Sequence, residues 1–139
     1  MTKSITEDVL AEYIRDGVVE SKHFGHLVAL SADGKVEYSK GDQSALIYPR
    51  SAIKSIQASA MLRNGLKLEP RLLALVCASH SGSKAHQDGA LEILKGAGLD
   101  ESALQCVLDR PIGVKERAEW GDKAPTRLAM NCSGKHSGM

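Results

Sequence analysis

The sequence predicts a mixed α+β fold in which antiparallel hairpins come first and helices follow. Two Asp-Gly pairs, Asp16-Gly17 and Asp33-Gly34, lie among β-branched residues near the start of the chain. This combination is a strong signal for a β-hairpin turn. From Ser51 onward, apolar residues recur at helical spacing instead, which indicates helices. We therefore assign the chain to the α/β class (mixed α+β), with its strands in the N-terminal part.

Four strands are predicted around the two turns. They cover Ala11–Arg15, Val18–His23, Gly25–Leu30 and Lys35–Ser39. The opening stretch is ambiguous, because its apolar residues also fit helical spacing, and Ser4 with Glu7 would form a capping box. A short helical lead-in is the alternative there.

Helices are predicted after the strands. The first runs from Ser51 to Gly65. Its expected apolar stripe consists of Ile53, Ile56, Ala60 and Met61. Pro70 suits the first position of a short buried helix that ends near Cys77. Further helices are expected at Lys84–Lys95, Asp100–Leu104 and Val114–Trp120, before a loop around Pro125. The final segment, NCSGKHSGM, has the composition of a loop that leads into a helix and presents polar groups to a ligand.

Length and composition are those of one soluble globular domain. The chain has 139 residues, of which 42% are hydrophobic and 25% charged. We therefore expect residues 1–139 to form a single domain. The formal net charge of +1 gives no electrostatic case for nucleic acid or an anionic membrane as a partner. No apolar run approaches the roughly 20 residues that a membrane span needs.

The cysteines indicate a reducing compartment. The chain has three cysteines, an odd number: Cys77, Cys106 and Cys132. No CxxC pair occurs among them. A disulfide framework is therefore not expected. The first residues are acidic and interrupted, unlike a secretory signal. These features predict a cytoplasmic protein.

Ser51 and Lys54 form a Ser-x-x-Lys pair at the start of the first predicted helix. At this spacing the two side chains lie on one helix face, with Cβ atoms about 5–6 Å apart, so the amine can reach the hydroxyl. An uncharged Lys54 could take the proton of Ser51 as the hydroxyl attacks a carbonyl. Free N–H groups of the first turn could stabilise the oxyanion. Taken alone, a helix cap followed by a solvated lysine is the simpler interpretation.

The segment CASHSG, residues 77–82, gathers a thiol, two hydroxyls and an imidazole at a helix end. A Cys77–His80 pair for thiol catalysis is conceivable, but a buried Cys77 that closes the helix is favoured. For Ser79 a functional role and a structural role are more evenly balanced, because Gly82 lets the loop pack against a ligand. The remaining histidines near this loop and in the strands are interpreted as structural; they are His23, His26 and His86.

The segment from Asn131 to His136 resembles two kinds of ligand loop. It fails as a phosphate-binding loop, because Ala129 stands where that pattern needs Gly and His136 stands where it needs Ser or Thr. Cys132 with Lys135 or His136 could bind a metal, but two donors fall short of the three or four of a zinc site. From the residues alone, metal binding is the less favoured outcome.

Four segments in order carry a family resemblance. They are VVESKHFGHLVALSADGKVEYSKGD, YPRSAIKSIQ, LALVCASHSGSKAHQDGALEIL and MNCSGKHSGM. From about residue 12 to its end, the chain resembles the N-terminal part of the type II-like (Rhizobium-type) L-asparaginases. The succession of CASHSG and NCSGKHSGM is the specific part of this match. The resemblance implies an architecture similar to serine β-lactamases and glutaminases.

The resemblance also implies roles for particular residues. Ser51 would be the nucleophile and Lys54 its lysine. Ser79 would belong to a second Ser–Lys pair. Cys132 and Lys135 would be ligands of a zinc ion. Because family members are longer, the partner lysine of Ser79 and a further cysteine ligand are expected beyond the NCSGK motif, and this chain is expected to be an N-terminal fragment.

The implied activity is that of an amidohydrolase, which converts L-asparagine to L-aspartate and ammonia through an acyl-enzyme. Arg50 and His80 are candidates, from their position alone, for orienting this small-molecule substrate. The family further implies a homodimer. Two other functions stay open: a catalytically silent truncated product, which the aromatic content of 4% favours, and a β-lactam-interacting serine hydrolase. The latter would want S-D-N and K-T-G partners, and neither motif occurs here.

Overall fold

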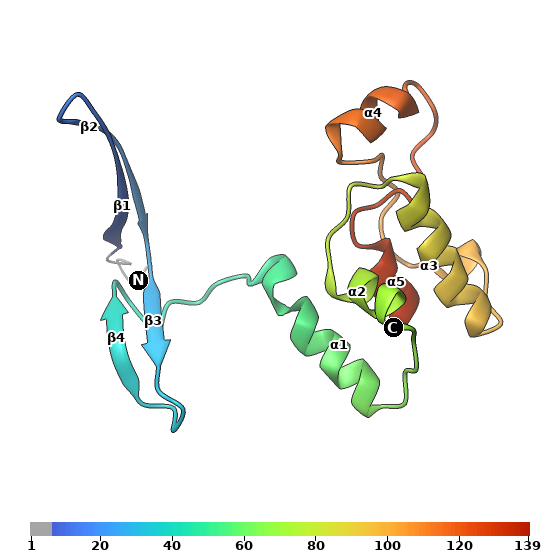
Figure 1. Ribbon diagram of the computed structural model, residues 1–139, viewed down its shortest axis with the longest axis horizontal. Coiled ribbons are helices and arrows are strands. Elements are labelled where there is room, and N and C mark those ends of the chain that lie inside the picture. Colours follow the sequence, from blue (N-terminus) through green and yellow to red (C-terminus); the bar gives the residue numbers. More distant parts are fainter. Residues whose placement is uncertain (1–6) are drawn as a thin grey trace, which may run out of the picture. The chain divides into compact units, whose positions relative to one another are not determined.

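The computed structural model describes residues 7–139. The chain divides into two compact units, of which the first ends at Tyr48 and the second runs from Pro49 to Met139. The first unit contains the strands and the second contains the helices (Figure 1). The single domain expected from the length stays a prediction, and each unit is described by itself below.

Two antiparallel hairpins make up the strand unit. The first pairs β1 (Asp8–Arg15) with β2 (Val18–Gly25), and the second pairs β3 (Leu27–Leu30) with β4 (Val36–Lys40). These four strands confirm the mixed α+β class and the predicted hairpins. The alternative of a helical lead-in is wrong for β1, because this segment pairs along its length with β2. The capping residue Ser4 of that alternative lies outside the described residues.

The first hairpin turn explains why an Asp-Gly pair is needed there. Asp16 and Gly17 both have positive φ angles, 49° and 79°. A two-residue turn with this backbone matches the right-handed twist of the flanking strands, and Asp followed by Gly adopts it at little steric cost. The second turn is longer: Ser31 and Lys35 close it through a backbone hydrogen bond of 2.8 Å, with Gly34 at a φ of 83°.

Polar contacts join the two hairpins within the strand unit. The Gly41 N–H donates to Asp8 at 2.8 Å, and the Asp42 N–H donates to Nδ1 of His26 at 2.9 Å. His26 therefore accepts a backbone hydrogen bond, as its structural interpretation predicts. The large apolar side chains of these strands are exposed, among them Tyr13, Phe24, Val28 and Tyr38.

The second unit is helical. Its elements are the 3-10 helix η1 (Arg50–Ile53), α1 (Lys54–Arg63), α2 (Pro70–Cys77), α3 (Lys84–Gly96), the 3-10 helix η2 (Glu101–Ala103), α4 (Val114–Trp120) and α5 (Ser133–Gly138). Each predicted helix is present. The start of the helix predicted from Ser51 and the short helix predicted at Asp100–Leu104 take 3-10 form, as η1 and η2. Within residues 7–139, no helix combines the length and the apolar character that crossing a membrane requires.

Two hydrophobic clusters form the core of this unit, and α3 contributes to both. One cluster joins Ala90, Leu94, Leu104, Cys106 and Leu128. The other joins Ala58, Leu72, Val76 and Ile93. The helix α1 therefore turns Ala58 and Lys54 inward, whereas Ile56 is 71% exposed. The apolar stripe predicted through Ile56 is wrong, because the buried face of α1 follows its contact with α2 rather than its largest apolar residues.

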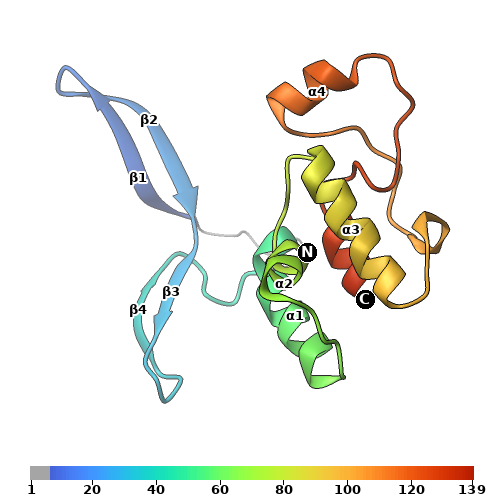
Figure 2. The ribbon, with the colours of Figure 1, turned by 45° about the vertical axis from the view of Figure 1, so that its right-hand side comes forward.

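The final segment forms a helix, not the loop that its composition predicts. The helix α5 packs against α2 and α3 (Figure 2). Its glycines permit the close approach: a Cβ on Gly134 would lie 2.5 Å from Cγ of Leu75, and one on Gly138 would lie 2.9 Å from Cγ2 of Val76. Glycine, and more weakly serine, disfavour an isolated helix, and α5 is held by the tertiary packing that the same residues allow.

Candidate active site

Lys54 begins α1 and carries its amine into the interior of the helical unit. The residue is only 3% exposed. Its Nζ donates to the carbonyl oxygen of Ala78 at 2.8 Å and to Oγ of Ser79 at 2.7 Å. No carboxylate of residues 7–139 forms an ion pair with it. A buried amine held by two neutral oxygens is an unusual arrangement for a lysine, which is mostly an exposed residue.

Ser79 links this amine to a second hydroxyl. Its Oγ lies 2.9 Å from Oγ of Ser51, and either oxygen can be the donor. Both serines are exposed, whereas Lys54 is buried. The three side chains therefore form a continuous chain of hydrogen bonds, from a hydroxyl that a small molecule can reach to an amine in the interior. The segments 50–54 and 78–79 are brought together by the packing of α1 against α2.

The route from Ser51 to Lys54 differs from the direct contact that their spacing predicts. The two side chains are joined through Ser79, not by a hydrogen bond of their own. The first turn is a 3-10 turn, in which the N–H of Ala52 donates to Pro49 and the N–H of Lys54 donates to Ser51. These two N–H groups are therefore not free for an oxyanion, contrary to the expectation for the first turn.

Arg50 directly precedes the exposed serine. Its φ of 50° lies in the left-handed region, which is uncommon for a residue other than glycine. Strained backbone of this kind costs about 1–3 kcal/mol and concentrates at functional sites. The side chain is exposed beside Ser51, so its predicted role in orienting a substrate stays a prediction compatible with this position.

His80 occupies a closed environment. It is 5% exposed; its Nδ1 accepts a hydrogen bond from the Gly82 N–H at 3.2 Å, and its Nε2 lies 3.0 Å from Oγ of Ser133. Burial, and then the charges of His86 and Lys54, lower the pKa of His80 to about 4. With both ring nitrogens engaged inside the protein, neither a thiol pair with Cys77 nor direct contact with a substrate is favoured.

Ser81, the residue after His80, ties the loop that carries Ser79 to α4. Oγ of Ser81 donates to Oε1 of Glu116 at 2.8 Å, and this hydrogen bond is the main cause that lowers the pKa of the Glu116 carboxyl. The Gly113 N–H also donates to the Ser81 carbonyl, at 2.9 Å. His86 lies at the same place, with Nδ1 2.9 Å from Oγ of Ser83, so its structural interpretation fits. The loop that carries Ser79 is thus held on several sides.

Cys132 and Lys135, the expected zinc ligands, lie one helical turn apart at the start of α5 and are both half-buried. A thiolate is a ligand that zinc favours. Within residues 7–139, no group of three or more His, Cys, Asp or Glu side chains is arranged to hold a metal ion, whereas a zinc site needs three or four donors. The pair fits zinc in the chemistry of its thiol but does not complete a site. Burial raises the pKa of Cys106, which disfavours the thiolate that a metal would bind.

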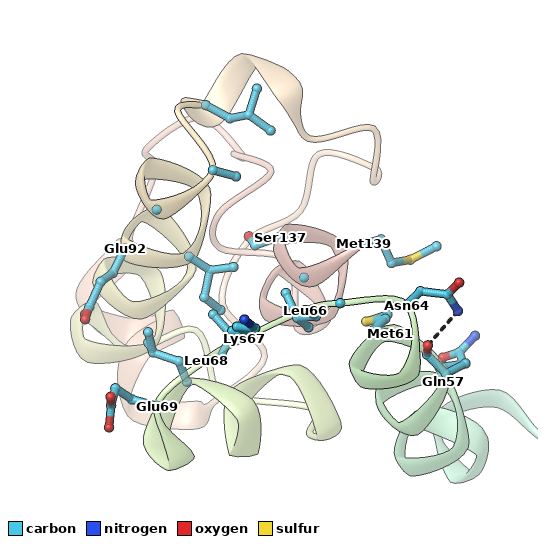
Figure 3. Close-up of a pocket in the computed structure, with 18 residues that line it drawn as sticks. Gln57, Met61, Asn64, Leu66, Lys67, Leu68, Glu69, Glu92, Ser137 and Met139 are labelled. Carbon is cyan, nitrogen blue, oxygen red and sulfur yellow. Dashed lines mark hydrogen bonds between the residues drawn. The ribbon is translucent and has the colours of Figure 1, made fainter.

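A separate groove lies between α1, α2, α3 and the end of α5 (Figure 3). Its apolar lining includes Met61, Leu66, Leu68, Leu72 and Ile93. Gln57, Asn64, Glu69 and Glu92 contribute polar groups to it. None of the candidate site residues lines this groove, so the serines and the groove are distinct features of the helical unit.

Ser133 and Glu116 are site-supporting residues that the sequence analysis did not single out. Ser133 is completely buried, and its Oγ donates to the carbonyl of Leu128 at 2.9 Å. The available signal for Ser133 is its spacing from Ser137, because residues four apart lie on the same face of a helix. Glu116 offers no such signal, since 35 residues separate it from Ser81.

The mixed α+β fold presents two linked hydroxyls and a buried amine, a combination of the kind that serine hydrolases use. Comparison with protein families matches residues 11–139 to the L-asparaginase II family. This match covers most of the chain, which therefore belongs to that family of asparaginase-type amidohydrolases. Comparison with curated proteins found no match.

Proposed function

We propose that this chain contributes the serine site of an enzyme that hydrolyses the side-chain amide of L-asparagine. The observation that carries the proposal is the hydrogen-bonded chain from Ser51 through Ser79 to Lys54. Membership of the L-asparaginase II family supports the substrate class. The exposure of Ser51 supports its role as the nucleophile, because the attacking oxygen must be reached by the substrate.

The first step is attack by Ser51 on the side-chain amide of the substrate. As its Oγ bonds to the amide carbon, the hydroxyl proton passes to Ser79, and the proton of Ser79 passes to Lys54. For this transfer the amine of Lys54 is uncharged and accepts from the Ser79 hydroxyl instead of donating to it. The 2.9 Å and 2.7 Å contacts are short enough for both transfers. The electron pair of the amide carbonyl moves onto its oxygen, which gives a tetrahedral intermediate.

The second step releases ammonia. The Lys54 ammonium returns its proton through Ser79 to the leaving nitrogen, the carbon–nitrogen bond breaks, and an aspartyl ester remains on Ser51. Water then attacks the ester with the same proton route in use, which frees L-aspartate and restores the hydroxyl. Ser79 thus acts as a relay, and Lys54 as the base and then the acid.

The test is ammonia release from L-asparagine, with L-glutamine as the comparison substrate. Ser51→Ala removes the nucleophile and should abolish turnover, and Ser79→Ala should lower kcat by about 10²–10⁴-fold because the proton route is interrupted. Ser59→Ala is the matched control, since Ser59 is an exposed serine of α1 bonded only to a backbone carbonyl. Normal turnover by Ser51→Ala would refute the mechanism.

We also propose Cys132 and Lys135 as this chain's share of a zinc site. The support is the family resemblance and the thiol chemistry of the pair. Zinc supplies a Lewis acid where it is bound, and no step above depends on it. Binding of zinc by the chain, and its loss in Cys132→Ser, would be measured by titration with a competing chelator.

A further inference from the structure

His80 joins the loop of Ser79 to helix α5. Its backbone N–H donates to the carbonyl of Asn131 at 3.0 Å, and its ring Nε2 lies 3.0 Å from Oγ of Ser133. The imidazole is 5% exposed and the Ser133 side chain is completely buried. Two contacts, one from the backbone and one from the side chain, therefore hold the residue that directly follows Ser79 in the chain.

The hydrogen bonds around the ring define its protonation. The Gly82 N–H can only donate, so Nδ1 of His80 accepts and carries no proton. A neutral imidazole then has its proton on Nε2, which donates to Oγ of Ser133. The Ser133 hydroxyl in turn donates to the carbonyl of Leu128 at 2.9 Å. Every donor in this series meets an acceptor.

Helix α5, which carries Ser133, is itself firmly held. Oγ of Ser137 donates to the carbonyl of Ser133 at 3.0 Å, one turn along α5. A Cβ on Gly134 would lie 2.9 Å from the Leu75 carbonyl oxygen, so α5 lies directly on the α2 backbone. Because α2 leads into Ala78 and Ser79, α5 and the Ser79 loop share one packed frame.

We propose that His80 is a positioning residue, a neutral Nε2–H imidazole whose bond to Ser133 sets the place of Ser79 between Ser51 and Lys54. The inference rests on the proposed function, in which Ser79 relays the proton. His80 itself does not touch the substrate. Its removal should therefore misalign the relay and lower kcat, while KM changes little.

The experiment compares four variants of the full chain in ammonia release and in the rate of serine labelling by a fluorophosphonate. His80→Ala and Ser133→Ala should each lower kcat and the labelling rate by about 10–100-fold, the scale of a small misplacement near the reacting atoms. The double variant should be no worse than either single variant, because each single variant already removes the shared bond between His80 and Ser133. His80→Gln should recover part of the rate, since its amide nitrogen can occupy the place of Nε2 and donate. Thermal unfolding of each variant identifies any that does not fold.

A second measurement needs no variant to be active. In two-bond proton–nitrogen correlation spectra of the histidine-labelled chain, the ring whose signals disappear in His80→Gln is that of His80, and it should carry its proton on Nε2 and none on Nδ1. A proton on Nδ1 would overturn the inference. So would full kcat in His80→Ala when Ser51→Ala is inactive, and this result would leave the proposed function standing. Full turnover by Ser51→Ala would instead reject the proposed function, and the relay with it.

Discussion

The amine of Lys54 and the hydroxyl of Ser79 lie 2.7 Å apart, although 25 residues separate them in the sequence. The contact joins the buried face of α1 to the loop that follows α2. Lys54 is consequently held by the loop that follows α2 rather than extended into solvent. This geometry places the amine one hydroxyl away from the exposed Ser51.

Replacement of Lys54 tests whether the amine accepts a proton. Lys54→Met removes the nitrogen and should lower kcat for ammonia release by about 10²–10⁴-fold. Lys54→Arg keeps a charge, but a guanidinium stays protonated at neutral pH and should be equally inactive. Lys95→Met, an exposed lysine at the end of α3, is the control and should keep the parent rate. An active Lys54→Arg would mean that the site needs the positive charge and not the base.

Two isoleucines test the observed core against the core predicted from periodicity. Ile93 is 4% exposed in α3, whereas Ile56 is 71% exposed in α1. Ile93→Ala should therefore lower the free energy of unfolding by about 2–5 kcal/mol, and Ile56→Ala should change it by less than about 0.5 kcal/mol. Urea denaturation followed by the fluorescence of Trp120, the single tryptophan, measures both. Equal losses would contradict the orientation of α1.

Local signals in the sequence were enough for the strands and for the helices before α5. Asp16-Gly17 indicated the first hairpin turn through its need for positive φ, and Pro70 indicated the first turn of α2. Such signals act over a few residues, and the structure retains them. The face that a helix buries depends instead on its neighbours, which is why the stripe through Ile56 was wrong and Lys54 was found inside.

The site followed the same division. The spacing of Ser51 and Lys54 predicted that the amine could reach the hydroxyl directly, but their link through Ser79 depends on the packing of two helices. The bond between His80 and Ser133 spans 53 residues and has no local signal. The helix α5 was expected to be a loop, because its Ser and Gly residues become favourable in a helix only against α2.

The close contact between α5 and α2 predicts a specific sensitivity to size. Gly134→Ala adds a methyl group where a Cβ would lie 2.5 Å from Cγ of Leu75 and 2.9 Å from its carbonyl oxygen. Backbone cannot yield as a flexible side chain does, so the free energy of unfolding should fall by about 1–3 kcal/mol. Gly96→Ala is the matched control: this helical glycine has no neighbour within 4 Å of an added Cβ, and alanine should be neutral or stabilise by up to about 1 kcal/mol. Thermal unfolding of both variants makes the comparison, and an unaffected Gly134→Ala would contradict the packing.

The buried imidazole of His80 predicts how stability depends on pH. Its pKa is lowered from 6.5 to about 4 by burial, with smaller effects from the charges of His86 and Lys54. Between these two values the unfolded chain binds a proton that the folded chain does not, so the free energy of unfolding should fall as the pH falls from 6.5 toward 4. His80→Gln has no such proton to bind and should show a shallower decline over this window. Urea denaturation followed by Trp120 at several pH values compares the variant with its parent, and identical slopes for the two chains would show that His80 titrates as it does in the unfolded state.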